Sequence, residues 1–590
     1  MANFRWSASM KSTMGFEDRT EPSSRQVSAC FLRKLQVLSF RSARGSLAAG
    51  LFYLLLAVGI MLPLFKSGYL LALDLSWTPN IPLPSSTNYY FVIFFVLHYL
   101  LYLLPSQLTE KLLLLGILWV AGYGMHRLIT ARSRVDPWAA YFGGILFVIN
   151  PFAYGRFLAG QYLILFGYAL MPWFIFALWN FLDCPNMRSS QRLVFWTLVV
   201  SIVDLHSIFF MAFFVLVSLL FLIAGRKIVV KQIFIWGLLS VVEWTLLSSY
   251  WLFPLVAGTS STASLIQNIN LQFVKAFQTV GDPKFGVLFN AMSMYGFWVD
   301  KTGHYILPKT LVFFWPEIAC VFLVLVLVGI VVSWRDAHAW VVLVVGVISL
   351  VLGVGIAFPP FAGFYLWMFY HVPFFKGDRE PEKFIGMVVL CYGYLGACGG
   401  SAIANSAKRK LGANAGTFSN VVISVVVLSL PFVYNPLEMW GFSGQMVPAA
   451  YPADWYFVNQ ELVADHSNFQ VLFLPWHMYL SFNFTHGIIY NPASSFFDKP
   501  TIQGNNIQIG SIYSGQNTPT SLFVENQILR DGPKVSDIGI LLNHINVKYV
   551  ILVKNFDVDR YLWLDKQADL TLINNTNNLF VFKNNVWIAH

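Results

Sequence analysis

Long apolar stretches separated by short basic clusters run through most of the chain, and they constrain its fold more than any other feature. Hydrophobic residues make up 57% of the 590 residues and charged residues only 11%, and the mean hydropathy is +0.61. A water-soluble domain could not hide so much apolar surface in one core, so the chain must use lipid as solvent. The sequence therefore predicts a mainly α-helical, polytopic membrane protein.

The apolar stretches predict about eleven crossings of a bilayer. The expected crossings are 47–65, 110–129, 138–155, 161–182, 192–204, 207–224, 232–255, 310–333, 339–357, 385–404 and 418–434. The apolar stretch 90–104 is not counted, because it is short for a crossing and rich in Tyr. We expect it to form a helix in the interfacial zone.

The basic residues predict the orientation of these crossings. Basic clusters lie in the tail 1–45 and at 127–134, 188–192, 226–231 and 408–410. With about eleven crossings all of them fall on one side, which the positive-inside rule makes the cytoplasmic side of a plasma membrane. Although the net charge is +10, it is divided among the ends of the apolar stretches, so nucleic-acid binding is not predicted.

This topology predicts three parts. The tail 1–45 is cytoplasmic and Ser-rich, without apolar periodicity, so we expect it to be disordered. The core 46–434 spans the membrane and sends out three longer outer loops, at 66–109, 256–309 and 358–384.

The last part, 435–590, is predicted to be an extracytoplasmic α+β domain, because hydropathy falls and turn residues increase. Its expected strands are 469–475, 548–553, 569–573 and 579–583, with a helix over 535–545. No HExxH, paired CxxC or GxxxxGK[ST] motif occurs in the chain, so neither a structural zinc site nor an ATP-driven pump is predicted.

Asp74 is the first candidate for chemistry. It lies in LALDLSWTPN, shortly after the first apolar stretch and on the predicted outer face. A carboxylate fixed there can act as a general base. The structural alternative is that Asp74 caps a turn or the following helix, since its loop is rich in Ser, Pro and Asn.

Three ionisable residues within the apolar segments are candidates to line a cavity. Glu243 lies deep in the crossing 232–255, where we expect it to be paired or protonated. Asp204 and His206 mark the turn between two short crossings. They could serve as secondary acid–base groups or as ligands of a divalent cation such as Mg²⁺ or Mn²⁺, and the alternative is a satisfied buried pair.

Three motifs together resemble a known family. They are the acidic residue of the first outer loop, NPFAYGRFLAGQ at 150–161, and DREPEKF at 378–384 before a late crossing. In this combination the chain resembles the GT-C superfamily of polyprenyl-phosphate-dependent membrane glycosyltransferases. It is most similar to the branch with the actinobacterial arabinofuranosyltransferases and uncharacterised prokaryotic relatives, over about residues 46–434.

The motifs also depart from the family pattern. The frequent Arg-Glu-Pro-x-Lys-Phe core is kept at 379–384, but Gly377 and Asp378 stand where the family often has an aromatic residue. The family frequently has a second acidic residue beside the carboxylate of the first loop, whereas Asp74 is flanked by Leu73 and Leu75. The sequence therefore offers no adjacent carboxylate pair for a metal ion at this position.

The resemblance implies an enzyme that transfers a sugar from a polyprenyl-phosphate donor to a hydroxyl of a glycan, lipid or protein acceptor at the outer face, with inversion. It makes Asp74 the catalytic base. A departing phosphate needs positive charge near its oxygens, and the candidates are Arg379, Lys383 and Arg156, with Glu380 lining the same cavity. The alternatives are an ordinary helix N-terminus for DREPEKF and snorkelling to the headgroups for Arg156.

Two other classes of function stay open. A transporter or flippase of a lipid-linked glycan would share the basic outer cavity. It would also need ionisable residues along a path that joins the two faces of the membrane. The predicted crossings contain few ionisable residues, of which Glu243 is one. A noncatalytic envelope-assembly protein on a GT-C scaffold would explain the missing second acidic residue.

Overall fold

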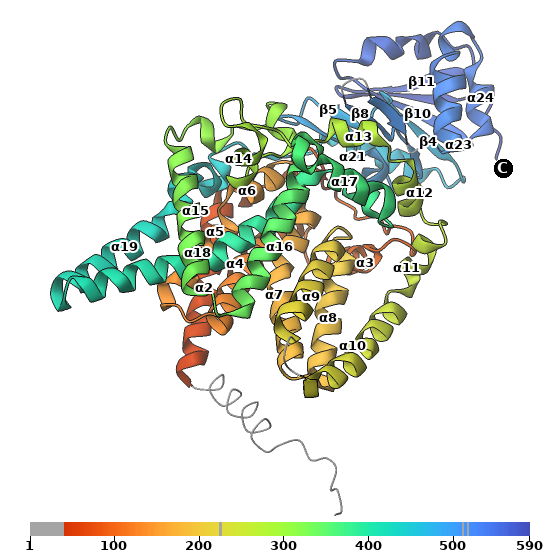
Figure 1. Ribbon diagram of the computed structural model, residues 1–590. Coiled ribbons are helices and arrows are strands. Elements are labelled where there is room, and N and C mark those ends of the chain that lie inside the picture. The colour runs from red at the N-terminus through yellow and green to blue at the C-terminus, as the bar shows by residue number, and fades with distance from the viewer. Residues whose placement is uncertain (1–39, 224–226, 510–511, 516–517, 590) are drawn as a thin grey trace, which may run out of the picture. The chain divides into compact units, whose positions relative to one another are not determined.

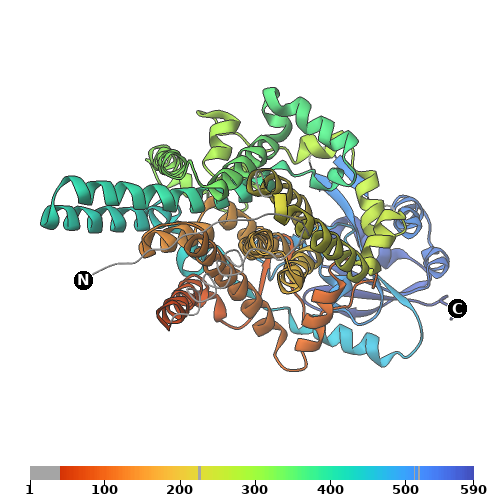
Figure 2. The same ribbon diagram turned by 60° about the horizontal axis from the view of Figure 1, so that its bottom comes forward.

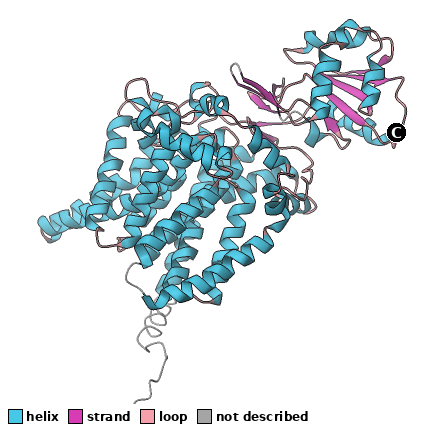
Figure 3. Cartoon of the chain, turned by 45° about the vertical axis from the view of Figure 1, so that its right-hand side comes forward, coloured by secondary structure: helices cyan, strands magenta, loops and turns pink. Residues whose placement is uncertain are grey.

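The structure is a computed structural model that describes residues 40–223, 227–509, 512–515 and 518–589. The predicted tail 1–45 lies largely outside the described residues. The chain divides into two compact units, Met1–Ala48 and Ala49–His590. Helices dominate the chain up to Tyr434, and most strands follow it (Figures 1 and 3). The predicted domain ranges stay predictions.

Eight helical segments of the described chain are long and apolar enough to cross a membrane, which indicates a membrane protein. Figure 2 views several of the helices nearly along their axes. The segments are Gly45–Phe65, Ser106–Arg132, Tyr162–Asp183, Val230–Leu247, Trp315–Val332, Ala337–Ala357, Pro381–Lys410 and Asn414–Tyr434.

The predicted count of about eleven crossings is not confirmed. Three of the expected crossings form shorter helices, α5 (Pro137–Val148, 12 residues), α8 (Met187–Val203, 17 residues) and α9 (Ser207–Ile223, 17 residues). A straight crossing needs about 20 residues. The stretch 90–104 contains the ten-residue helix α3 (Phe91–Leu100).

The helices of the core are α2 (Phe40–Met61), α4 (Ser106–Arg132), α5, α7 (Tyr162–Asp183), α8, α9, α10 (Lys227–Leu247), α15 (Trp315–Val332), α16 (Ala337–Val354), α18 (Ile385–Lys410) and α19 (Ala413–Tyr434). Shorter helices in the connections are α3, α6 (Pro151–Leu158), α11 (Ser249–Val256), α12 (Ser261–Asn268), α13 (Leu271–Ala276), α14 (Gly286–Met292) and α17 (Pro359–His371).

Helix α18 forms the centre of the core and packs against α15, α16, α19 and α5. Its approach to α15 depends on two glycines. A Cβ at Gly399 would lie 1.9 Å from the carbonyl oxygen of Leu325, and one at Gly329 would lie 2.0 Å from that of Leu395. Small residues let helix backbones come this close inside a bundle, and α18 holds the DREPEKF segment at its N-terminal end.

A five-stranded sheet forms the centre of the C-terminal part and contains all four predicted strands. Its order is β11-β12-β10-β4-β7, with β10 parallel to β4 and antiparallel to β12. The strands are β4 (Gln470–Leu474), β7 (Thr501–Ile502), β10 (Val547–Val553), β11 (Leu570–Asn575) and β12 (Leu579–Asn584). The helices here are α20 (Met439–Phe442), α21 (Ala453–Ala464), α22 (Ala493–Phe496), α23 (Pro519–Phe523) and α24 (Ile538–His544).

Small sheets connect the helical core to the C-terminal part. Strand β1 (Tyr69–Ala72) pairs with β2 (Leu75–Ser76) and, on its other edge, with β3 (Pro448–Ala449). Two hairpins follow, β5–β6 (Tyr479–Ser481 and Ile488–Tyr490) and β8–β9 (Asn506–Ile509 and Ile512–Gly515). The turn between β1 and β2 carries Asp74.

Candidate active site

The NPFAYGRFLAGQ motif forms the short buried helix α6. Asn150 caps its N-terminus, because the side-chain oxygen accepts a hydrogen bond of 2.9 Å from the backbone N–H of Ala153. Pro151 occupies the first helical position, which needs no N–H donor. Every side chain of α6 is buried, including that of Arg156. Snorkelling of Arg156 to the surface is therefore not observed.

Gly160, the second-last residue of this motif, allows the turn of Asp74 to approach α6. The φ of Gly160 is +72°, and a Cβ there would lie 2.2 Å from the backbone N of Leu75 and 2.3 Å from the carbonyl oxygen of Ala72. Only glycine meets both conditions. The backbone N–H of Asp74 donates to the carbonyl of Ala159 at 3.1 Å, so the turn rests directly on the end of α6.

The other side of the turn is held by strand β6. The N–H of Leu73 donates to the carbonyl of Ile488 at 3.1 Å, and the carbonyl of Leu73 accepts from the N–H of Tyr490 at 2.7 Å. Leu73 adopts a φ of 42°, in the left-handed region. The backbone of Asp74 is thus fixed between the helical core and the C-terminal part.

Two side chains donate hydrogen bonds to the carboxylate of Asp74. The hydroxyl of Tyr479 donates to Oδ1 at 2.5 Å, and Nε2 of Gln161 donates to Oδ2 at 3.0 Å. Asp74 remains exposed despite these partners. Its carboxylate is therefore oriented by the protein and still accessible, as a group that acts on a substrate must be.

The protein around Asp74 raises the pKa of its carboxyl group above the usual value. Withdrawal of the charge from bulk water is the main cause, and Glu380 adds to it, whereas the hydrogen bonds from Tyr479 and Gln161 and the charge of Lys383 lower the pKa. Burial and the neighbouring Asp74 also raise the pKa of Tyr479 well above its usual value. Tyr479 therefore stays protonated and acts as the donor.

Arg156 links Asp74 to the DREPEKF segment. Its guanidinium group has an exposed fraction of 0% and donates to Oε1 of Gln161, to Oε2 of Glu380 at 3.3 Å and to Oε1 of Glu382 at 3.2 Å. The ring of Phe297 lies beneath it, 3.9 Å from the guanidinium carbon. A buried cation of this kind is retained only where carboxylates compensate it.

Lys383 and His206 extend the same network. Nζ of Lys383 lies 3.8 Å from Oε1 of Glu380 and 3.0 Å from Nε2 of His206, whose Nδ1 lies 2.9 Å from Oδ1 of Asp378. The lysine ammonium only donates, so Nε2 of His206 accepts and Nδ1 carries the proton that it donates to Asp378. Hydrogen bonds, together with the ion pair of Lys383 and Glu380, thus connect Asp74 to Asp378.

Glu380 lies at the centre of this network and stays ionised. Burial would raise the pKa of its carboxyl group, but Lys383, Arg156 and Arg379 act together against it and hold the pKa at about 2. The three cations are therefore arranged around one permanent negative charge.

Arg379 differs from the other two cations, because it forms no ion pair or hydrogen bond with any described residue. Its guanidinium carbon lies 5.2 Å from the ring centre of Phe277 and 5.9 Å from that of Phe273, both in the segment around α13. Its Nε is buried without a partner among the described residues. Of the predicted phosphate-binding residues, Arg379 is the one whose donors are free.

The two remaining candidates are placed differently. Asp204 caps α9, since its Oδ2 accepts from the N–H of Ser207 at 3.1 Å and from its hydroxyl at 2.6 Å. It thereby fixes the turn that carries His206 but does not itself join the network. Glu243 lies on α10 and has no hydrogen bond or ion pair with any described residue, so it is not brought to the site.

The donor set does not fit a divalent cation. No group of three or more His, Cys, Asp or Glu side chains in the described chain is close enough to hold a metal ion. Glu380 and Glu382 already compensate Arg156 and Lys383, which leaves Asp74 as an isolated carboxylate.

Four residues of the network were not among the predicted site residues. Asp378 and Glu382 lie within the DREPEKF motif and Gln161 ends the other motif, so their position in the motifs was a usable signal. Tyr479 carries no sequence signal, because it approaches Asp74 only through the pairing of β5 and β6 with the turn at Leu73.

The fold is similar to that of solved structures. No family model and no curated protein matches the chain. Among solved structures, the chain is similar to the arabinofuranosyltransferase AftD from Mycobacteria, with a TM-score of 0.55 and 13% identity over 92% of this chain and 40% of that chain. A mutant form of AftD gives a TM-score of 0.54, also at 13% identity, over 92% of this chain and 41% of that chain.

A third solved structure is more distant. ArnT from Cupriavidus metallidurans, bound to undecaprenyl phosphate, gives a TM-score of 0.44 at 12% identity, over 92% of this chain and 98% of that chain, a score too low to establish a shared fold. The chain spans about two fifths of the length of AftD. The likeness to AftD extends over nearly the whole chain, so the chain shares the fold of the matching two fifths of AftD.

Proposed function

We propose that the protein is a membrane glycosyltransferase that moves a sugar from a polyprenyl-phosphate donor to an acceptor hydroxyl. The carrying observation is the network that joins the accessible carboxylate of Asp74 to the cations of the DREPEKF segment through Gln161 and Arg156. A base and positive charge held together in this way suit the displacement of a phosphate by a hydroxyl. The fold shared with AftD supports the same reaction class.

The proposed reaction is a single displacement. The acceptor hydroxyl attacks the anomeric carbon of the donor sugar while its proton passes to Oδ1 or Oδ2 of Asp74. The bond between the anomeric carbon and the phosphate oxygen breaks, and its electron pair leaves with the polyprenyl phosphate. One displacement at the anomeric carbon inverts its configuration. No general acid is needed, because the phosphate departs as a stable anion.

The three cations have different parts in this proposal. Arg379 contacts the phosphate directly, since its donors have no described protein partner, and a guanidinium can donate two parallel hydrogen bonds to phosphate oxygens. Lys383 and Arg156 form ion pairs with Glu380 and Glu382. In this proposal they add positive electrostatic potential without contacting the phosphate, and they fix the position of Glu380. Arg379 then provides most of the stabilisation of the negative charge that develops on the leaving phosphate.

The proposed placement follows the distribution of basic residues. The N-terminus and the basic clusters lie in the cytoplasm and Asp74 lies at the outer face, together with the C-terminal α+β part. The polyprenyl chain of the donor lies in the membrane beside the core. The acceptor, a glycan, lipid or protein hydroxyl, approaches from the extracytoplasmic side of the plasma membrane.

The test measures release of polyprenyl phosphate by the purified full-length chain in lipid nanodiscs. Short-chain polyprenyl-phosphate donors with pentofuranose and hexose sugars are supplied with a mixture of glycan acceptors. We expect Asp74→Asn to lower turnover about 10²- to 10⁴-fold, the usual value of a positioned base. Asp559→Asn is the matched control, because Asp559 is exposed and far along the chain from the network.

Two outcomes would contradict the proposal. Full activity of Asp74→Asn would remove the base assignment, and no release with any donor would favour a noncatalytic role of the GT-C fold.

A further inference from the structure

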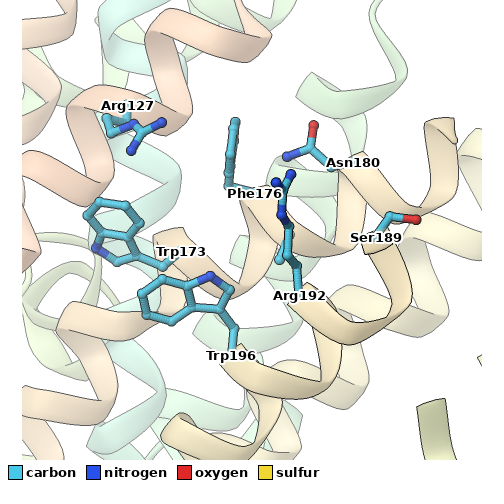
Figure 4. A pocket seen from close by; sticks show the side chains of 8 residues that line it. Arg127, Trp173, Phe176, Asn180, Ser189, Arg192 and Trp196 are labelled. Carbon is cyan, nitrogen blue, oxygen red and sulfur yellow. The ribbon is translucent and has the colours of Figure 1, made fainter. Parts of the chain in front are cut away.

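A second site lies at the opposite end of α7 from Asp74. A cavity of about 310 Å³ opens between α4, α7 and α8, within the range of small-ligand pockets. It is lined by Arg127, Trp173, Phe176, Ala177, Asn180, Ser189, Arg192 and Trp196 (Figure 4). Gln161 precedes the first residue of α7, and Asn180 lies about 28 Å further along at about 1.5 Å per residue. The cavity is therefore separate from the candidate active site.

Aromatic rings hold the guanidinium group of Arg127 at the wall of this cavity. Its central carbon lies 5.4 Å from the ring centre of Trp173 and 5.6 Å from that of Phe176. Trp173 in turn stacks on Trp196, with ring centres 5.3 Å apart and an angle of 21° between the planes. Contact with ring faces stabilises a cation without using its N–H donors, so those donors remain available to a ligand.

Arg192 brings a second guanidinium group to the same cavity from α8, and Figure 4 shows Phe176 between the two arginines in that view. Neither arginine has an ion pair or hydrogen bond with any described residue. The nearby Asp183 is not free for them, because it pairs with Arg132 at 2.5 Å. Arg127 is half-buried and Arg192 is exposed, so the N–H donors of both can bind an anion that enters the cavity.

We propose that this cavity binds the phosphate of an anionic phospholipid. Arginine suits phosphate oxygens because its planar fork can donate two hydrogen bonds to them, and basic pockets between membrane helices take anionic headgroups. Ser189 lies in the first turn of α8, where the helix dipole also favours negative charge.

The surroundings indicate a lipid as the source of the phosphate. Both α4 and α7 are of membrane-spanning length, and Phe195 of α8, next to the cavity residue Trp196, is exposed. The acyl chains lie along this apolar surface while the headgroup enters the cavity. Tryptophan side chains are typical of the zone where headgroups meet the hydrocarbon.

The test counts lipids retained by the full-length protein in native mass spectrometry. The protein is purified in detergent with equal amounts of phosphatidylglycerol and phosphatidylcholine. We expect one phosphatidylglycerol to be retained in preference to phosphatidylcholine. Arg127→Gln and Arg192→Gln should each lower this retention about fivefold, the effect of one basic residue near an anionic headgroup. Arg188→Gln is the matched control, since Arg188 is exposed on the same helix and does not line the cavity.

Unchanged retention in both arginine variants, or an equal loss in Arg188→Gln, would overturn the proposal. Because Arg192 is exposed, Arg192→Gln alone decides the matter if Arg127→Gln does not fold. A second arm adds inorganic phosphate and follows tryptophan fluorescence. If phosphate alone gives an arginine-dependent signal while lipid retention ignores both substitutions, the ligand is a free phosphate and the lipid assignment is wrong.

Discussion

The phenolic oxygen of Tyr479 lies 2.5 Å from Oδ1 of Asp74, although 405 positions separate the two residues along the chain. Tyr479 belongs to the first strand of a hairpin in the C-terminal part, and Asp74 to a turn of the first loop. The C-terminal part thus supplies a direct partner of the proposed base.

Tyr479→Phe should move the acidic limb of the pH–rate profile to higher pH. The hydrogen bond from Tyr479 lowers the pKa of Asp74, so its loss raises that pKa further. The base must be deprotonated, and activity is lost as the pH falls through its pKa. The measurement is kcat/KM for donor consumption across the acidic range. Tyr99→Phe, on the exposed surface of α3, serves as control, and an unshifted limb would show that Tyr479 does not tune Asp74.

Arg156→Gln should destabilise the protein by about 3–5 kcal/mol, the usual cost of breaking a buried ion pair. The substitution leaves Glu380 and Glu382 without the guanidinium group that compensates both. Thermal unfolding in detergent, followed by intrinsic fluorescence, measures the change. Arg134→Gln removes an equal charge from an exposed position and should unfold like the wild type. Equal unfolding of all three proteins would mean that the buried pairs contribute nothing.

Arg379→Gln should lower kcat/KM for the lipid-linked donor about 10- to 100-fold, because a charge-assisted hydrogen bond contributes about 1.5–3 kcal/mol. Arg379→Lys should restore part of the loss, since it keeps the charge but not the planar fork. Lys376→Gln removes a nearby cation that stacks on Phe369 and is the matched control. If Lys376→Gln loses as much activity as Arg379→Gln, the loss comes from the removal of any nearby positive charge and Arg379 has no specific contact with the phosphate.

Gly160→Ala should lose activity and stability together. The added Cβ would overlap the backbone of Leu75 and Ala72, and the φ of +72° disfavours any side chain. The turn of Asp74 must then move away from α6. Gly116→Ala is the control, because nothing lies within 4 Å of a Cβ there, and we expect it to be neutral or stabilising by up to about 1 kcal/mol. Normal transfer by Gly160→Ala would show that the turn tolerates displacement.

Local sequence signals were sufficient for most strands of the C-terminal sheet and for the motif that directly precedes α18. Four of the five strands of the C-terminal sheet, β4, β10, β11 and β12, are rich in apolar residues and bounded by turn residues, so they could be predicted without knowledge of their neighbours, whereas the two-residue strand β7 was not predicted. The helix count was less readable. Pro151 begins a new helix directly after Asn150, so the apolar stretch 138–155, which looks continuous in hydropathy, becomes two short helices.

The ion pairs of Arg156 with Glu380 and Glu382 could not be predicted from the sequence. Arg156 stands at the end of an apolar stretch, where exposure to headgroups is the ordinary outcome, yet it is buried because Glu380 and Glu382 approach it from a segment more than 200 positions later. No local pattern encodes such a meeting. The roles of Asp74, Arg379 and Lys383 in catalysis stay predictions.

The hydrogen bonds from β6 to Leu73 also have a consequence for the order in which the protein is made. The ribosome completes the membrane helices before it reaches the hairpin that secures the turn of Asp74. A nascent chain can therefore hold the turn of Asp74 against Ala159 and Gln161, but it still lacks β6 and the phenol of Tyr479 on the other side. The side of the turn that faces the hairpin is therefore completed only after translation has passed Tyr490.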